Sequence, residues 1–240
     1  MKVNNFQTVL NNYIAGYFAV GLLINRRTFI DDLKYFFNQP KWDKSYLLQL
    51  LLKYDVSPEV LFQRFNILPK HFDMPKMFFI RMIHDPGAKE FHIDKELHLN
   101  RQHQPHANSL DEHYCRRWLS ISQLQKLADK EQATTQVEVG VQFSKYTGTE
   151  DEYFCFTIAR PAYFPSDNNV SVTIGLLADK ELQEKINFSK DASIPRKMVS
   201  VTCERCPIQN CAERIAPPIA LEKKAHKYKM EEALDKMMNE

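Results

Sequence analysis

The spacing of apolar residues changes near Met77, and this change constrains the fold of the 240-residue chain more than any other feature. Up to about residue 70, apolar side chains recur at the spacing of helices. From Met77 to Thr202 most of them alternate with polar residues, as in strands that bury one face. We therefore expect an α+β protein, in which an N-terminal helical subdomain precedes an antiparallel sheet domain.

The N-terminal part predicts a series of helices. Its most apolar run, residues 13–24, is about half as long as a membrane span, so we expect a buried helix rather than an anchor. Thr28 predicts the start of the next helix, and Asp43 is a typical N-cap. Ser57 and Pro58 suit the N-cap and first position of another. The residue pattern over 50–65 resembles a helix-turn-helix motif. Because its second half is mainly apolar, we interpret it as a packed helical hairpin and not as a DNA-binding motif.

The second part predicts strands over residues 77–83, 90–94, 136–146, 152–160, 170–177 and 198–202. Asp85-Pro86-Gly87 predicts the hairpin turn between the first two. A helix over about residues 110–130, opened by a capping box of Ser109 and Glu112, is expected to interrupt the strands. An amphipathic helix follows Pro217. We expect it to dock along one side of the protein, with a homodimer contact as the alternative.

Cys203, Cys206 and Cys211 lie within nine residues of each other. The C-x2-C-x4-C spacing, where a strand opens into a loop, favours a metal or iron–sulfur site over a redox pair or inert thiols. Cys115 is the expected fourth ligand, because a helix N-terminus and a neighbouring arginine stabilise a thiolate. Cys155 lies inside an apolar strand and is expected to be a core residue.

The ligand spacing favours an iron–sulfur cluster over zinc, because structural zinc sites usually combine two C-x2-C pairs. Zinc remains the alternative metal, and His113 the alternative fourth ligand. An odd number of cysteines without a secretory leader leads us to expect a reducing cytoplasm.

A second group of residues is basic and surrounds the expected start of the helix at residue 110. Its members are Arg101, His103, His106, Arg116 and Arg117. If the loop folds over the helix start, these side chains form a positive patch that suits a phosphorylated ligand. The histidines have irregular spacings, so we interpret them as loop residues rather than a second metal site.

No catalytic motif is recognisable in the sequence: it has no H-E-x-x-H, no G-x-S-x-G and no glycine-rich phosphate loop. We therefore expect no enzymatic activity. A formal net charge of +2 argues against an obligate nucleic-acid coat.

The chain resembles the C-terminal region of short-chain fatty-acyl transcriptional regulators of the XRE family. Its C-terminal half carries the resemblance through Cys115-x2-Trp118 and through Cys203-x2-Cys206-x4-Cys211-x2-Arg214-x2-Pro217-Pro218. The N-terminal helices are similar to the ImmA/IrrE-like segment of that family, through Phe18-Ala19-x3-Leu22-Leu23 and Val56-Ser57-Pro58.

The resemblance implies an ImmA/IrrE-like helical remnant over residues 1–75 and a GAF-like sensory domain over 76–202. It also implies a cysteine cluster loop with a C-terminal helix over 203–240. The implied effector is a short-chain acyl-CoA, and the implied cofactor is a [4Fe–4S] cluster on the four cysteines. DNA contact is expected only through a domain missing from this chain. Asn12 and Ile14 stand where a metallopeptidase ligand is expected, so no peptidase activity is carried over. The alternative function is a zinc-stabilised protein-interaction module.

Overall fold

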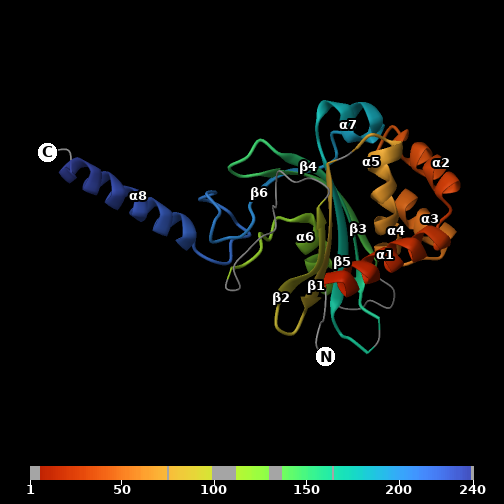
Figure 1. Ribbon diagram of the computed structural model, residues 1–240, viewed down its shortest axis with the longest axis horizontal. Coiled ribbons are helices and arrows are strands. Elements are labelled where there is room, and N and C mark those ends of the chain that lie inside the picture. The colour runs from red at the N-terminus through yellow and green to blue at the C-terminus, as the bar shows by residue number, and fades with distance from the viewer. Residues whose placement is uncertain (1–5, 75, 99–111, 130–136, 164, 239–240) are drawn as a thin grey trace.

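The computed structural model describes residues 6–74, 76–98, 112–129, 137–163 and 165–238. Its centre is a curled six-stranded sheet, with α2 to α5 on one face and α6 on the other (Figure 1). This arrangement confirms the predicted α+β class and its N-terminal helical part. The helices are α1 (Phe6–Leu23), α2 (Arg26–Phe37), α3 (Lys44–Tyr54), α4 (Pro58–Arg64), α5 (Leu68–His71), α6 (Leu119–Ala128), α7 (Lys180–Lys185) and α8 (Ile219–Met238), with short 3-10 helices η1 (Phe65–Ile67) and η2 (Asn187–Lys190).

The strands are β1 (Met77–Asp85), β2 (Glu90–His98), β3 (Glu138–Tyr146), β4 (Glu152–Pro161), β5 (Asn169–Leu177) and β6 (Arg196–Val199). Their order across the sheet is β2-β1-β5-β4-β3-β6. The neighbouring pairs are antiparallel except β3 and β6, which run parallel. The exception arises because α7 and η2 lie between β5 and β6 and carry the chain back along the sheet before its last strand.

The sheet carries an apolar core on each face, so the expectation that its strands bury one face only is wrong. β3, β4 and β5 are buried over nearly their whole length, because helices cover both sides. On the helical face, Phe154 and Phe156 pack with Phe36 of α2 and Phe188 of η2, and the Phe36 and Phe188 ring centroids are 4.9 Å apart. On the other face, Phe78 and the apolar side of α6 form a second core. The helical part therefore packs directly on the sheet and shares a core with it.

The N-caps predicted at Asp43 and Ser57 are confirmed. Asp43 accepts a hydrogen bond from the Ser45 N–H, and Ser57 accepts one from the Val60 N–H. However, α2 begins two residues before Thr28, because the Asn25 side chain accepts from the Arg27 and Thr28 N–H groups.

The helix predicted over residues 110–130 is shorter than expected. In the described part of this segment, α6 begins only at Leu119. Glu112 does not cap a helix: it accepts a hydrogen bond from the Thr202 hydroxyl at 2.9 Å and pairs with Arg205 at 2.7 Å. Ser109 lies outside the described residues. Among the described residues, Glu112 thus has partners about ninety residues away along the chain.

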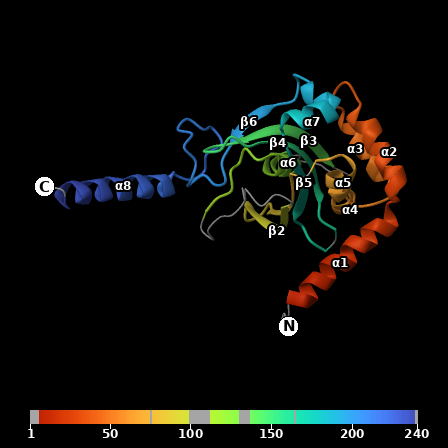
Figure 2. The ribbon, with the colours of Figure 1, turned by 45° about the horizontal axis from the view of Figure 1, so that its top comes forward.

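The prediction that residues 13–24 form a buried helix is also wrong. Val20 and Ile24 are buried, but Phe18 is 66 % and Leu22 72 % exposed. In Figure 2, α1 extends away from the other helices, with the N-terminus at its far end. It packs mainly against α4, and much of its apolar surface is left uncovered. In the described residues no helix is both long and apolar enough to span a bilayer.

The C-terminal helix α8 is present, but it does not dock. None of its residues is buried, and both views show it extending away from the sheet (Figures 1 and 2). At its first turn the Ala220 N–H donates to the Glu204 carbonyl at 3.1 Å, which fixes its base beside the cysteine segment.

Gly175 of β5 is a position where we expect a single methyl group to destabilise the protein. A Cβ there would lie 2.2 Å from Cε1 of Phe78, its partner across the strand pair. Phe78 is itself buried against Tyr153, so its ring has little room to turn. Gly175→Ala should lower the free energy of unfolding by about 1–3 kcal/mol, as measured by urea denaturation. The control is Gly16→Ala in α1, where a Cβ meets nothing within 4 Å. Equal stability of the two variants would contradict the argument.

Candidate functional site

Two segments far apart in sequence lie side by side next to α6 and bring cysteines together. The Cys203 N–H donates to the His113 carbonyl at 2.9 Å, and the Cys115 N–H donates to the Val201 carbonyl at 3.2 Å. Between them, Tyr114 and Thr202 form an antiparallel bridge. This pairing holds Cys115 beside the cysteine loop, as the sequence analysis expected. It does so through a short strand-like contact and not through a helix N-terminus.

Cys115, Cys203 and Cys206 are all buried free thiols. A tight turn joins the last two, with the Cys206 N–H donating to the Cys203 carbonyl at 3.2 Å. The Cys115 sulfur accepts a hydrogen bond from the Ser200 N–H at 3.5 Å. Burial raises the pKa of the Cys115 thiol to about 11, and the nearby Cys206 and Cys203 act in the same direction. Negative charge on the Cys115 sulfur is therefore unfavourable unless a cation shares the site.

Arg214 fixes the shape of the cysteine loop from inside. Its Nη1 donates to the carbonyls of Cys203 at 2.9 Å and Ala216 at 3.3 Å. Its Nη2 donates to the carbonyls of Cys206 at 3.1 Å and of Ile208. One planar guanidinium thus binds two carbonyls of the Cys203–Cys206 turn and two of the following loop.

Glu204 and Trp118 connect the loop to the rest of the protein. The Trp118 Nε1–H donates to the Ser200 carbonyl at 2.8 Å. Buried Glu204 accepts from the His113 N–H at 3.0 Å and contacts the His113 Nδ1 at 2.6 Å. Burial alone opposes its ionisation, but the hydrogen bonds from His113 hold the pKa of Glu204 below its ordinary value. Nothing in the sequence distinguishes this buried carboxylate, because a glutamate between two cysteines looks like an exposed loop residue.

Cys211, the remaining cysteine of the predicted ligand set, lies differently. It is half-buried, and its sulfur is 3.8 Å from a carboxylate oxygen of Glu213. Within the described ranges, no group of three or more His, Cys, Asp or Glu side chains is arranged to hold a metal ion. The buried thiols fit a thiolate-bound metal in their chemistry, but the side chains do not form a closed coordination shell.

The predicted basic patch is described only in part. Arg101, His103 and His106 lie outside the described residues. The Arg116 guanidinium lies 4.4 Å from the centre of the Phe91 ring, and the Arg117 Nε is 3.1 Å from Glu213. These two arginines therefore have separate partners, and their role in ligand binding stays a prediction.

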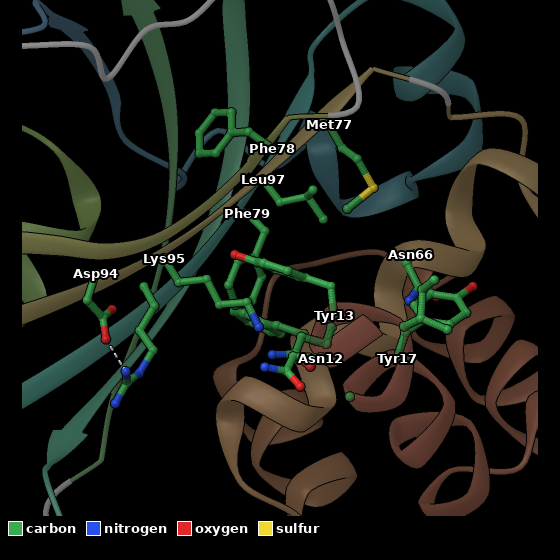
Figure 3. Close-up of a pocket in the computed structure, with 15 residues that line it drawn as sticks. Asn12, Tyr13, Tyr17, Asn66, Met77, Phe78, Phe79, Asp94, Lys95 and Leu97 are labelled. Carbon is green, nitrogen blue, oxygen red and sulfur yellow. Dashed lines mark hydrogen bonds and ion pairs between the residues drawn. The ribbon is translucent and has the colours of Figure 1, made fainter. Parts of the chain in front are cut away.

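A cavity of about 700 Å³ lies between α1, α4 and the β1–β2 edge of the sheet (Figure 3). Its walls are mainly apolar and aromatic, and include Tyr13 and Tyr17 of α1, Phe79 of β1 and Leu97 of β2. The volume is in the range of small-molecule sites. No residue pattern in the sequence indicated this cavity, because it forms where the exposed helix α1 approaches a sheet edge.

Lys95 places a positive charge at the wall of this cavity. Its ammonium lies 5.4 Å from the ring centre of Tyr13 and 5.8 Å from that of Phe79. Burial lowers the pKa of Lys95, and Arg81 acts in the same direction. The neighbouring Asp94 is paired with Arg81 (Figure 3), and no described carboxylate forms an ion pair with Lys95. An apolar cavity that contains the ammonium group of Lys95 suits an amphiphilic ligand that carries a negatively charged group.

Glu59 links α4 to the sheet beside this cavity. Its Oε1 is 3.2 Å from both Arg81 Nε of β1 and Arg160 Nη2 of β4. Burial opposes its ionisation, but its own backbone N–H and the positive charge of Arg160 hold the pKa of Glu59 below its ordinary value of 4.5.

We expect Glu59→Gln to destabilise the protein in a pH-dependent manner. Because the folded-state pKa of Glu59 is lowered, its contribution is complete above pH 4.5 and is lost as the pH falls through the lower folded-state value. The variant should be about 2–3 kcal/mol less stable at neutral pH. The difference in the free energy of unfolding between the variant and the wild type should disappear at acidic pH, as measured by urea unfolding from pH 7 downward. A gap that does not vary with pH would show that ionisation of Glu59 contributes nothing.

Comparisons of the chain with protein families, with curated proteins and with solved structures found no match.

Proposed function

We propose that this chain is the effector-sensing, metal-binding region of a bacterial transcriptional regulator. One observation carries the proposal: Cys115 and the Cys203–Cys206 turn come from distant segments, yet lie together as buried free thiols. Buried thiols held together by backbone pairing are typical of metal sites in reducing compartments. The resemblance to short-chain fatty-acyl regulators supplies the regulatory part of the proposal.

The proposed cofactor is a [4Fe–4S] cluster held by Cys115, Cys203, Cys206 and Cys211, with zinc as the alternative metal. A bound cluster supplies a redox-sensitive link between two chain segments. For Cys211 to join the other thiols, its sulfur must turn away from Glu213. The Arg214 hydrogen bonds keep the turn of Cys203 and Cys206 in place while this happens.

The proposed effector is a short-chain acyl-CoA, and the apolar cavity beside α1 is suited to its acyl chain. Because α1 forms one wall and is otherwise exposed, a ligand in the cavity would favour one position of α1 over others. DNA contact would be made by a domain outside this chain. Movement of α1 would then transmit the presence of the effector.

The test is purification without oxygen, followed by a visible spectrum and assays of iron, sulfide and zinc. A broad absorption near 400 nm with about four irons and four sulfides per chain supports the cluster. One zinc in a colourless protein favours the zinc-stabilised interaction module instead, because zinc–thiolate sites do not absorb visible light. A protein without either metal contradicts the metal-binding proposal.

A further inference from the structure

A second pocket, with a volume of about 460 Å³, adjoins the apolar cavity and has the opposite character. It lies between α1, the start of α2 and the segment from the end of α4 to α5. Its basic residues are Arg26, Arg64, Lys70 and His71. Tyr17 and Asn66 line both this pocket and the apolar cavity. Among the described residues that line the basic pocket, none is an aspartate or glutamate.

Arg64 is the central residue, because it is buried without a countercharge. It ends α4, is 7 % exposed, and its Nε has no hydrogen-bond partner. Burial lowers the pKa of Arg64, and the like charge of Arg26 acts in the same direction. Within the described ranges no carboxylate forms an ion pair with Arg64. Its Nη1 lies 3.6 Å from the place where a Cβ on Gly21 would be, so the guanidinium lies directly against α1. A buried guanidinium without an anion is unfavourable.

The start of α2 adds to the positive potential. Asn25 and Arg26, the N-cap and first residue of this 12-residue helix, both line the pocket. The first turn of α2 contains no acidic residue that would neutralise the helix dipole.

We propose that this pocket binds a phosphate group, with the Arg64 guanidinium as the central donor and Arg26 and Lys70 beside it. A guanidinium matches phosphate oxygens with parallel N–H donors, and helix N-termini favour anions. The inference goes beyond the proposed function, since it requires neither a metal nor an acyl chain. The occupant is either free phosphate or the phosphate of an organic ligand whose body reaches the apolar cavity past Tyr17.

The test is thermal unfolding of the full chain in increasing pyrophosphate, with the ionic strength held constant by sodium chloride. Wild-type protein should show a saturable rise in its unfolding temperature, because an anion that binds only the folded state stabilises it. Arg64→Met should weaken the apparent affinity at least about tenfold. Arg27→Ala is the control: it removes an equal charge one residue from Arg26, at a position that does not line the pocket.

A second readout separates binding from a structural role of Arg64. Without the anion, Arg64→Met should unfold at the wild-type temperature or higher, because it removes an unpaired buried charge. Lys70→Ala, a change at an exposed position, should also weaken the pyrophosphate response while leaving the fold intact. The proposal is overturned if pyrophosphate does no more than sodium chloride, or if Arg64→Met and Arg27→Ala change the response equally. It is also overturned if Arg64→Met is strongly destabilised without the anion.

The two sources of phosphate are separated by comparing inorganic phosphate with butyl phosphate. If the pocket serves an organic ligand, butyl phosphate should bind more tightly, because its chain can bury apolar surface in the adjoining cavity. Equal affinities identify a site for the free anion. Either result supports the phosphate site. If neither compound binds, the phosphate site is excluded.

Discussion

Cys206→Ser is expected to reduce the metal content of the purified protein at least about tenfold. Serine is nearly the size of cysteine, but its hydroxyl is a poor ligand for zinc or iron. Cys206 is buried and lies one turn from Cys203, so no other described thiol can replace it without rearranging that turn. The measurement is iron, sulfide and zinc per chain after purification without oxygen.

The matched control for this change is Cys155→Ala, which removes a buried thiol from the interior of β4. Burial raises the pKa of Cys155 to about 12, as expected for an inert core thiol. This variant should keep the metal content of the wild type, although it loses some core packing. Full metal content in Cys206→Ser would exclude Cys206 as a ligand. Equal loss in both variants would indicate that the metal depends on general stability.

Features determined by neighbouring residues were the most predictable from the sequence. Asp43 and Ser57 act as caps because each side chain reaches an N–H only two or three residues away. The turn at Asp85-Pro86-Gly87 forms for a similar reason, since the Asp85 side chain accepts from the Gly87 N–H at 2.8 Å. Alternation predicted the strands because a buried face needs an apolar residue at every second position.

Features determined by distant residues were missed. A capping box was predicted at Glu112, but its carboxylate binds Thr202 and Arg205. The expected burial of α1 and docking of α8 failed for a related reason. Apolar spacing shows that a helix has a face to cover, but it does not show which surface covers that face. In the described residues, both helices keep much of that surface exposed.

The candidate site was partly predictable. Cysteine spacing drew attention to the loop of Cys203, Cys206 and Cys211, because three thiols within nine residues are uncommon outside metal sites. Cys115 was added on the expectation of a helix N-terminus, yet α6 begins only at Leu119, and a strand-like pairing places Cys115 beside the loop instead. Lys95 and Arg64 gave no comparable signal. Each resembles an ordinary surface cation in the sequence, and only the fold shows that both lie in cavities without a described carboxylate partner.

Arg214→Ala should have the second large effect, on the cysteine loop. The change removes donors to the carbonyls of Cys203, Cys206, Ile208 and Ala216. We expect metal affinity to fall about 10–100-fold, as for other residues that orient ligands without binding the metal. Titration of metal into the metal-free protein measures this loss.

Arg214→Lys separates the geometry of the guanidinium from its charge. A lysine keeps the positive charge, but its single ammonium cannot reach the four carbonyls in one plane. If the planar arrangement holds the loop, Arg214→Lys should resemble Arg214→Ala. The hydrogen exchange of the Cys206 N–H should then increase in both variants, because its bond to the Cys203 carbonyl loses the adjoining support. Wild-type affinity and exchange in Arg214→Lys would mean that charge alone is sufficient. The thiols would then owe their positions to the pairing between residues 113–115 and 201–203, in which the Cys203 N–H donates to the His113 carbonyl.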